Sequence, residues 1–384
     1  MAYNRLTFKF DLPHTMNRMI HHHDSAPACA DKQGSMKGFD QEFTDIVDYI
    51  LRITLRIWEG KQVGLCADYY SDDCPVYTLA GMTVGAEEVT QNTLSTLAAF
   101  PDRTLHADNI IWGGDDEHGF HTSHLISTQM TNMGDTEYGP ATGKHATIQV
   151  IAHCVVKENR IVEEWLVRDN YSLVEQLGYN PDEIALAQAQ AEPQVRYQEW
   201  HQSELSRVPN AVNAERRALP DTLSDTQNTE ALILASLQNI WNCRMVGDVN
   251  QAYSENAELH ASANRELSGH EEIAQFYISF FGTFSNLKLA LDYSCQQAAA
   301  DGGTDVAVRW TMVGDHTGSK LFGAPSGAPI LILGESQFHV VDGKIVEEWT
   351  VFDQLAVLSQ IHRARLKAPN SASDLDNNFG NDKN

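Results

Sequence analysis

The chain has 384 residues, of which 42% are hydrophobic and 9% aromatic, and its formal net charge is -25. This composition is typical of a globular protein and excludes an intrinsically disordered chain. The excess of acidic residues argues against nucleic acid or an anionic membrane as the main partner, because both are bound through clustered Lys and Arg. At roughly 100–200 residues per domain, the length predicts two or three domains.

Targeting signals and cysteine spacing bear on the cellular compartment. The sequence has no apolar run of about 18 residues, so we expect no membrane span. Its first residues lack the apolar core of a secretion signal. The six cysteines show no CxxC spacing and no disulfide framework. We therefore expect a cytoplasmic protein with reduced thiols.

An internal repeat organises the chain. Residues 161–170 read IVEEWLVRDN and residues 345–354 read IVEEWTVFDQ, at an offset of 184 residues. The same offset relates Gly85, in the sequence GAEE, to Gly269, in the sequence GHEE. Because the offset is the same from Gly85 to residue 170, the sequence predicts a tandem of two similar domains.

The repeat divides the chain into five segments. We expect an N-terminal arm (1–38), copy 1 (39–180), a polar and partly helical linker (181–224), copy 2 (225–362) and a tail (363–384) whose composition predicts disorder. The arm contains His21, His22 and His23. We interpret this run as solvated side chains and predict no metal site and no organic cofactor.

Each copy shows the same elements in the same order. In copy 1, apolar residues at helical spacing predict a first helix from Phe43 to Trp58. A second helix is expected to begin after Gly85, where two glutamates favour a helix N-terminus, and to end near Phe100. Strand-like runs follow at 104–112, 119–131, 144–156 and 160–168.

In copy 2 the last two strands are joined by Val-Asp-Gly-Lys. Asp-Gly between alternating apolar runs predicts a tight hairpin. Helices followed by an antiparallel meander predict an α+β fold. We expect two tandem cone-shaped domains, each a curved antiparallel sheet packed on N-terminal helices, with a pocket inside the cone.

The closing motif resembles the SnoaL-like polyketide cyclase family of the NTF2-like superfamily. Copy 2 reads VAVRWTMVGDHTGSKLFGAPSG and then FHVVDGKIVEEWTVFDQLAVLSQ, and copy 1 ends EEWLVRDNYSLVEQLG. The resemblance implies that an Asp on the last strand is the general acid/base of an aldol-type ring closure that uses no cofactor. The matching residues are Asp169 and Asp353. The same scaffold also carries isomerases, dehydratases, epoxide hydrolases and non-catalytic binders.

The chemistry of a buried carboxylate is consistent with this role. Beside Trp165 or Trp349, inside an apolar cone, Asp169 or Asp353 would lose solvation, which raises its pKa. Such a group is suited to removing a proton alpha to a carbonyl and returning it. The alternative is that each Asp caps the helix that follows its strand. The two interpretations are compatible.

The resemblance also implies a histidine partner on the preceding strand, and the candidates are His153 and His339. They do not align with each other, because His153 aligns with Gln337. With a two-residue turn, strand parity places each histidine on the face opposite its Asp unless a bulge intervenes. The alternative to a role in the pocket is that His153 and His339 are structural histidines.

Other candidates for substrate binding lie outside the closing motif. By local alignment His124 corresponds to Arg309. A basic group at this position would stabilise an enolate or bind a carboxylate. The alternative is a buried ion pair. His121 and His124 should point to opposite faces of one strand, which argues against a shared metal ion. The remaining candidates for substrate binding are His316, Tyr70 and Trp58. The alternative for His316 is that it shapes a turn, and the alternative for Tyr70 and Trp58 is that they belong to the core.

Two functions of different classes follow. The first is a cofactor-independent acid/base enzyme that cyclises, isomerises or dehydrates a small carbonyl compound. The second is a non-catalytic module that binds a small ligand or a protein. Epoxide hydrolysis would need two carboxylates beside an arginine, and Arg309 with Asp353 supplies only part of that set.

The copies differ in their polar residues. Copy 1 is richer in histidine, which favours it as the active copy, whereas copy 2 keeps the family's segment from Arg309 to His316 better. Because NTF2-like domains commonly pair through their sheets, the resemblance implies an internal pseudo-dimer of the two copies. A further homodimer is left open.

Overall fold

The computed structural model describes residues 36–219 and 229–367. Most of the predicted arm, including the three histidines, lies outside the described residues. So does the predicted tail after Lys367. The helix α10 (Gln354–Lys367) continues to Lys367, so a tail beginning at residue 363 was predicted too early.

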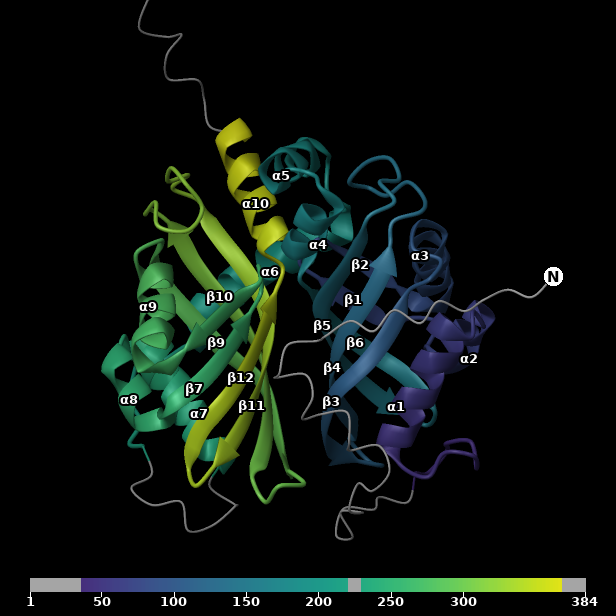
Figure 1. Ribbon diagram of the computed structural model, residues 1–384, viewed down its shortest axis with the longest axis horizontal. Helices are drawn as coiled ribbons and strands as arrows, with labels where there is room; N and C mark the ends of the chain where they lie inside the picture. The colour runs from purple at the N-terminus through teal and green to yellow at the C-terminus, as the bar shows by residue number, and fades with distance from the viewer. Residues whose placement is uncertain (1–35, 220–228, 368–384) are drawn as a thin grey trace, which may run out of the picture. The chain divides into compact units, whose positions relative to one another are not determined.

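Helices pack on a six-stranded sheet in each copy (Figure 1). Copy 1 contains α1 (Ile46–Thr54), α2 (Cys66–Tyr69), β1 (Pro75–Thr78), β2 (Gly81–Val84), α3 (Gly85–Ala99), β3 (Thr104–Asp115), β4 (Gly119–Thr131), β5 (His145–Lys157), β6 (Arg160–Arg168) and α4 (Asn170–Leu177). Copy 2 contains α7 (Thr229–Leu237), α8 (Val249–Ala252), β7 (Tyr253–Ala261), β8 (Arg265–Ser268), α9 (Gly269–Phe281), β9 (Phe284–Ala298), β10 (Thr304–His316), β11 (Pro329–Val341), β12 (Lys344–Phe352) and α10. The order of elements confirms the repeat.

The two sheets have the same topology. Their strand orders are β2-β1-β6-β5-β4-β3 and β8-β7-β12-β11-β10-β9. The predicted four-stranded meander is confirmed, but the expectation of a wholly antiparallel sheet is wrong. Each copy adds a short hairpin whose first strand pairs in parallel with the last strand, β1 with β6 and β7 with β12.

The predicted Asp-Gly hairpin joins β11 to β12. Asp342 and Gly343 have φ values of 49° and 72°. A two-residue turn of this type requires positive φ at both positions, which suits Gly. The corresponding turn of copy 1 uses Glu158 and Asn159 at φ values of 45° and 71°.

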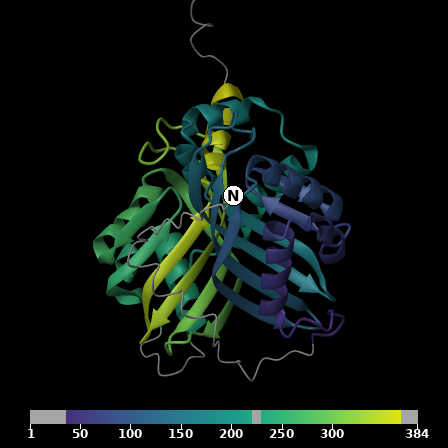
Figure 2. The ribbon, with the colours of Figure 1, turned by 45° about the vertical axis from the view of Figure 1, so that its right-hand side comes forward.

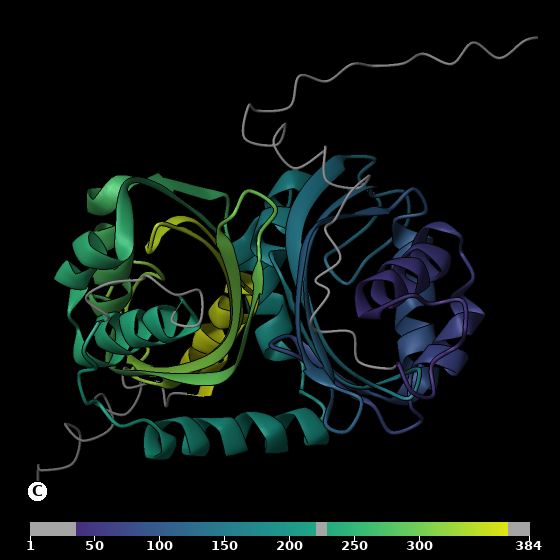
Figure 3. The ribbon, with the colours of Figure 1, turned by 90° about the horizontal axis from the view of Figure 1, so that it is seen from below.

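The helices at the start of copy 1 cover one face of its sheet. Ile46, Tyr49, Ile50 and Ile53 of α1 are buried, at the spacing that forms one helical face. They share a core cluster with Cys154 and other inward residues of the sheet. Figure 2 shows α1 in purple against the sheet, and Figure 3 shows both sheets curving around their helices. We call the face of a sheet that packs on its own helices the inner face, and the other the outer face.

The linker contains two helices, α5 (Pro181–Gln190) and α6 (Val195–Ala211). The long teal helix in Figure 3 is α6, which contacts both copies. The hydroxyl of Tyr197 donates to the carbonyl of Leu79 in copy 1 at 2.7 Å. Arg207 pairs with Asp292 in copy 2 at 2.9 Å. None of the helices in the described ranges has the length and apolar composition needed to cross a bilayer.

Candidate functional site

Buried polar side chains line the inner face of the copy 1 sheet. The register pairs Thr122 of β4 with Cys154 of β5, and Cys154 with Glu164 of β6. His124 lies two residues after Thr122, and Arg168 lies four residues after Glu164. Because side chains alternate along a strand, all four polar residues share the inner face with Cys154.

Three of these residues have buried atoms without a hydrogen-bond partner among the described residues. They are Thr122 Oγ1, His124 Nε2 and Arg168 Nε. The His124 side chain is 4% exposed, and burial lowers its pKa to about 3, so the ring is neutral at pH 7. Buried polar atoms are normally hydrogen bonded, so three exceptions on one face single out this region.

Glu164 is the carboxylate of this face. Its Oε2 accepts a hydrogen bond from the hydroxyl of Tyr70 at 3.1 Å. Burial raises the pKa of Glu164, although the Tyr70 bond acts in the opposite direction. In the sequence Glu164 stands out only as part of the closing motif EEW. Because Trp165 was expected on the inner face, alternation would have placed Glu164 on the outer face, so the sequence carried no signal for its position.

Positive charge lies on the same face. The guanidinium carbon of Arg103 is 4.7 Å from the ring centroid of Trp58, and its Nε donates to Thr128 Oγ1 at 3.0 Å. Burial and the nearby charge of Arg168 lower the pKa of Arg103 to about 9. The predicted site residues Trp58 and Tyr70 therefore both contact polar groups of the inner face.

The equivalent face of copy 2 has its carboxylate fully partnered. Glu348 Oε2 accepts from Tyr253 at 2.5 Å, and Oε1 accepts from Thr350 Oγ1 at 2.5 Å. The hydroxyls of Tyr253 and Tyr277 are 2.7 Å apart. Burial raises the pKa of Glu348 to about 7. Both inner faces thus contain a hydrogen-bonded Tyr–Glu pair. The unpartnered atoms of Thr122, His124 and Arg168 belong to copy 1.

The predicted alignment of His124 with Arg309 is wrong by one residue. His124 pairs with Ala152 across β4 and β5, and Val308 pairs with Ser336 across β10 and β11. Ala152 and Ser336 are separated by the repeat offset, so Val308 is the counterpart of His124. A slip of one residue reverses the face of a strand. Arg309 consequently lies on the outer face.

Two of the predicted site residues, Arg309 and Trp165, meet between the outer faces of the two sheets. The guanidinium carbon of Arg309 in copy 2 lies 3.4 Å from the ring centroid of Trp165 in copy 1. The expectation that Trp165 lines the cone is wrong, because alternation turns it away from the inner face that holds Glu164. Trp349 is likewise on the outer face, where His260 stacks on it with ring centroids 5.5 Å apart.

A chain of hydrogen bonds accompanies this contact. His153 Nδ1 lies 3.1 Å from Glu335 Oε1, and His153 Nε2 lies 3.1 Å from His121 Nδ1. Tyr293 stacks on His121 with ring centroids 4.0 Å apart. Burial and His153 lower the pKa of His121 to about 4. As predicted, His121 and His124 point to opposite faces.

Asp169 is the N-cap of α4. It accepts hydrogen bonds from the backbone N–H of Ser172 at 3.2 Å and from the Ser172 hydroxyl at 2.5 Å. The backbone N–H of Ala263 in copy 2 donates a further bond at 2.9 Å. Burial raises the pKa of Asp169, as expected, against the effect of the Ser172 bonds. The capping interpretation is confirmed, and the catalytic role stays a prediction.

Asp353 occupies the equivalent position before α10. It accepts from the backbone N–H of Ala356 at 3.1 Å and from Asn170 Nδ2 of copy 1 at 2.6 Å. Burial raises its pKa to about 6. Both aspartates therefore cap a helix and accept a hydrogen bond from the other copy.

The predicted His–Asp pairs do not hydrogen bond within the described chain. A register shift at Val155 and Val156 lets His153 share the outer face with Trp165, and hence with Asp169, so the expectation of opposite faces is wrong. His339 contacts two other acids, with Nδ1 2.7 Å from Asp305 and Nε2 3.0 Å from Asp301. The Asp305 bond is the main cause that raises the pKa of His339 to about 9.

His316 shapes the loop after β10. Its Nδ1 accepts from the backbone N–H of Ser326 at 3.2 Å, and the side chain is buried. A surface hollow of about 530 Å³ lies on α6 beside Gln202 and contains none of the predicted site residues. The buried polar groups of copy 1, rather than this hollow, define the candidate site.

Comparison with known proteins gives a family match in both copies. A family model described as SnoaL-like polyketide cyclase matches residues 49–177 and 231–361, which together make up more than half of the chain. No curated protein matches.

Solved structures resemble single copies. AclR, a putative hydroxylase from Streptomyces galilaeus, is 21% identical over 36% of this chain and 97% of its own, with a TM-score of 0.31. IdmH, a putative polyketide cyclase from Streptomyces antibioticus, is 22% identical over 34% of this chain and 97% of its own, with a TM-score of 0.30. A protein with a ketosteroid isomerase-like fold from Catenulispora acidiphila is 13% identical over 33% and 90%, with a TM-score of 0.28.

Proposed function

Because the chain belongs to the SnoaL-like polyketide cyclase family, we propose that copy 1 performs general acid–base chemistry on a small carbonyl compound. Aldol-type cyclisation, isomerisation and dehydration all begin by removing a proton alpha to a carbonyl. The observation that carries the proposal is the buried, unpartnered Nε2 of His124 on the same inner face as the buried carboxylate of Glu164. A polar ligand atom would satisfy that nitrogen.

Each polar group has a role in this proposal. Glu164 takes the proton from the alpha carbon while the electron pair moves to the carbonyl oxygen, and the carboxylic acid later returns the proton. Burial raises the pKa of Glu164, which makes it a stronger base than an exposed glutamate. Arg168, on the same face, stabilises the enolate oxygen by its charge. His124, which is neutral, orients the carbonyl by hydrogen bonding.

Asp169 and Asp353 are the competing candidates for the base. Both are buried and the pKa of each is raised by burial, which suits the chemistry. Both also cap a helix, and Asn caps a helix about as well as Asp. Substitution by Asn therefore removes the acid/base group while it preserves the cap, which makes the comparison with Glu164 informative.

Proton exchange tests the proposal without knowledge of the product. Purified full-length protein is incubated in D₂O with a panel of ketones and β-dicarbonyl compounds, and loss of the alpha proton is followed by NMR. We expect Glu164→Gln to slow exchange by about 10²-fold or more, the usual contribution of a general base. The matched variant Glu348→Gln in copy 2 should leave it unchanged. Exchange that survives Glu164→Gln but is lost in Asp169→Asn would assign the base to Asp169 instead.

Non-catalytic binding of a small ligand is the second candidate. The same unpartnered atoms of Thr122 and His124 favour it, because they would hold a polar ligand whether or not a proton moves. A compound that raises the melting temperature of the wild type but not of a His124→Leu variant, with no exchange of its alpha protons, would support binding alone.

A further inference from the structure

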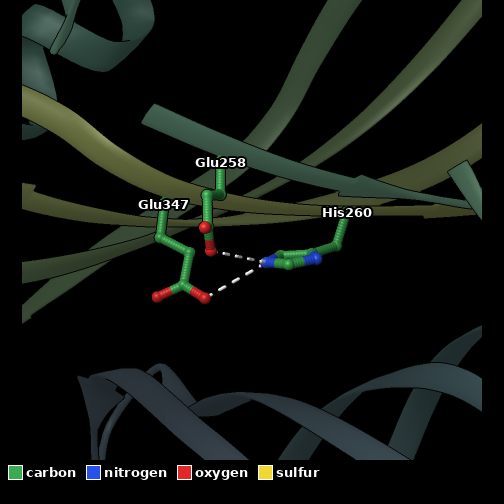
Figure 4. Close-up of side chains that lie close together, drawn as sticks. All are labelled: Glu258, His260 and Glu347. Atoms are coloured by element: carbon green, nitrogen blue, oxygen red, sulfur yellow. Dashed lines mark hydrogen bonds and ion pairs between the residues drawn. The ribbon is translucent and has the colours of Figure 1, made fainter. Parts of the chain in front are cut away.

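Three glutamates surround His260 on the outer face of copy 2, and they are Glu258, Glu266 and Glu347. Glu258 and His260 lie two residues apart on β7, and the parallel register places Glu347 of β12 opposite Glu258. Side-chain alternation puts Glu258, His260 and Glu347 on one face of the sheet. Figure 4 shows both carboxylates turned toward the same ring nitrogen of His260.

The distances suit a small metal ion. His260 Nε2 is 3.1 Å from Glu347 Oε1 and 4.0 Å from Glu258 Oε2. All three donor atoms lie within 4.8 Å of one another. A tetrahedral zinc ion with bonds of about 2.0–2.2 Å holds its ligand atoms about 3.4 Å apart. The two measured distances bracket that value, so small side-chain shifts would complete the site.

The ring of His260 is held in place from its other side. Its Nδ1 is hydrogen bonded to Glu266, and the ring stacks on Trp349 at an interplanar angle of 22°. In metal-binding histidines the nitrogen that does not bind the metal almost always donates to a carboxylate, a backbone carbonyl or a water, and Glu266 is such a carboxylate. This arrangement directs Nε2 at Glu258 and Glu347.

The local charge also favours a cation. Across residues 36–219 and 229–367, no Lys or Arg forms an ion pair with Glu258, Glu266 or Glu347. The single imidazole cannot neutralise three carboxylates. The side chains of Glu258 and Glu347 are 45% and 27% exposed, which leaves the position open to an ion and to water.

Copy 1 shows that the fold itself does not require these residues. The register places Tyr77 opposite Trp165, as His260 lies opposite Trp349. Tyr77 stacks on Trp165 at 5.5 Å and 22°, the same geometry as His260 on Trp349. Pro75 stands where copy 2 has Glu258. The donor set is therefore a feature of copy 2 alone.

We propose that Glu258, His260 and Glu347 bind a divalent metal ion of the zinc type, with Glu266 as the orienting group of His260 and water in the remaining position. A mixed set of imidazole and carboxylate donors with one open position is typical of zinc sites that keep a bound water. The alternative is that His260 is held by its carboxylates as a plain ion pair.

Titration with Zn²⁺ tests the site. To remove any contribution of the run His21–His23 to Zn²⁺ binding, the full-length chain carries Ala at those three positions in every sample. We expect one Zn²⁺ per chain by calorimetry, with a dissociation constant below about 10 μM. Co²⁺ should give the visible absorption of a tetrahedral site.

Matched substitutions locate the ion. His260→Tyr should weaken Zn²⁺ binding at least 100-fold while it keeps the stacking seen in copy 1, and Glu347→Gln should weaken it as a second, isosteric variant. Glu163→Gln, the copy 1 counterpart of Glu347→Gln, should leave affinity unchanged. Unchanged Zn²⁺ affinity in His260→Tyr and Glu347→Gln, or no binding below about 1 mM in the parent chain, would overturn the proposal in favour of an ion pair only.

Discussion

The imidazole of His153 in copy 1 and the carboxylate of Glu335 in copy 2 are hydrogen bonded to each other, with 3.1 Å between Nδ1 and Oε1. Their side chains are 0% and 2% exposed. A second contact joins Gln337 Nε2 in copy 2 to the backbone carbonyl of Ser123 in copy 1 at 3.1 Å. The copies are therefore held together by buried polar contacts with defined partners, and not only by apolar packing.

Removing Glu335 should destabilise the chain. Glu335→Ala leaves His153 Nδ1 buried without its hydrogen-bond partner, and leaving a buried polar group unsatisfied costs about 1–3 kcal/mol. The free energy of unfolding, measured by urea denaturation, should fall by that amount. Glu192→Ala, at an exposed loop position, is the control and should change it by less than about 0.5 kcal/mol. A loss for Glu335→Ala no greater than for the control would show that the pair contributes nothing to stability.

The raised pKa of Asp353 predicts a pH dependence of stability. In the folded state its pKa is about 6, against an ordinary value of 3.8. As the pH rises from about 4 to 6, the unfolded chain releases this proton while the folded chain retains it, so stability falls in that window. Below it the group is protonated in both states, and above it the loss is complete.

Asp353→Asn removes this titration. Between pH 4 and 6.5 the wild type should therefore lose about 2 kcal/mol more unfolding free energy than Asp353→Asn, because this window covers most of the interval between the unfolded and folded pKa values of Asp353. Urea denaturation of both proteins at the two pH values measures it. Parallel pH dependences would mean that Asp353 keeps an ordinary pKa in the folded protein.

Replacing His124 by an apolar residue should stabilise the protein. His124→Leu removes a buried polar group whose Nε2 has no partner, and such groups cost about 1–3 kcal/mol. The unfolding free energy should rise, while binding of any ligand on this face should weaken. A structural histidine would give the opposite sign, a loss of stability with no change in ligand affinity.

The sequence alone was enough to predict the repeat, the element order and the α+β class. The offset of 184 residues and the helical spacing of residues such as Ile46 and Ile50 depend on local patterns, which survive into the structure. The parallel pairing of β1 with β6 could not be predicted in the same way. It joins segments far apart in the chain, and neither segment has a pattern that names its partner.

The face of the sheet on which a given side chain lies was the hardest feature to predict from the sequence. A one-residue error in aligning His124 with Arg309 moved Arg309 from the outer to the inner face, and the bulge at Val155 and Val156 reversed the expected face of His153. Both errors have one cause, because strand periodicity is two and any slip inverts every assignment after it. Alternation within one strand was reliable, and it separates Glu164 from Trp165.

The position of a bound ligand shows whether the inner face of copy 1 is the active site. A carbonyl compound selected by thermal shift would be soaked into crystals of the wild-type protein, and the density examined in both copies. Ligand should lie on the inner face of copy 1, with a polar atom within hydrogen-bond distance of His124 Nε2 and its alpha carbon against Glu164. Density only on the inner face of copy 2, or only between the outer faces near His121, would contradict it.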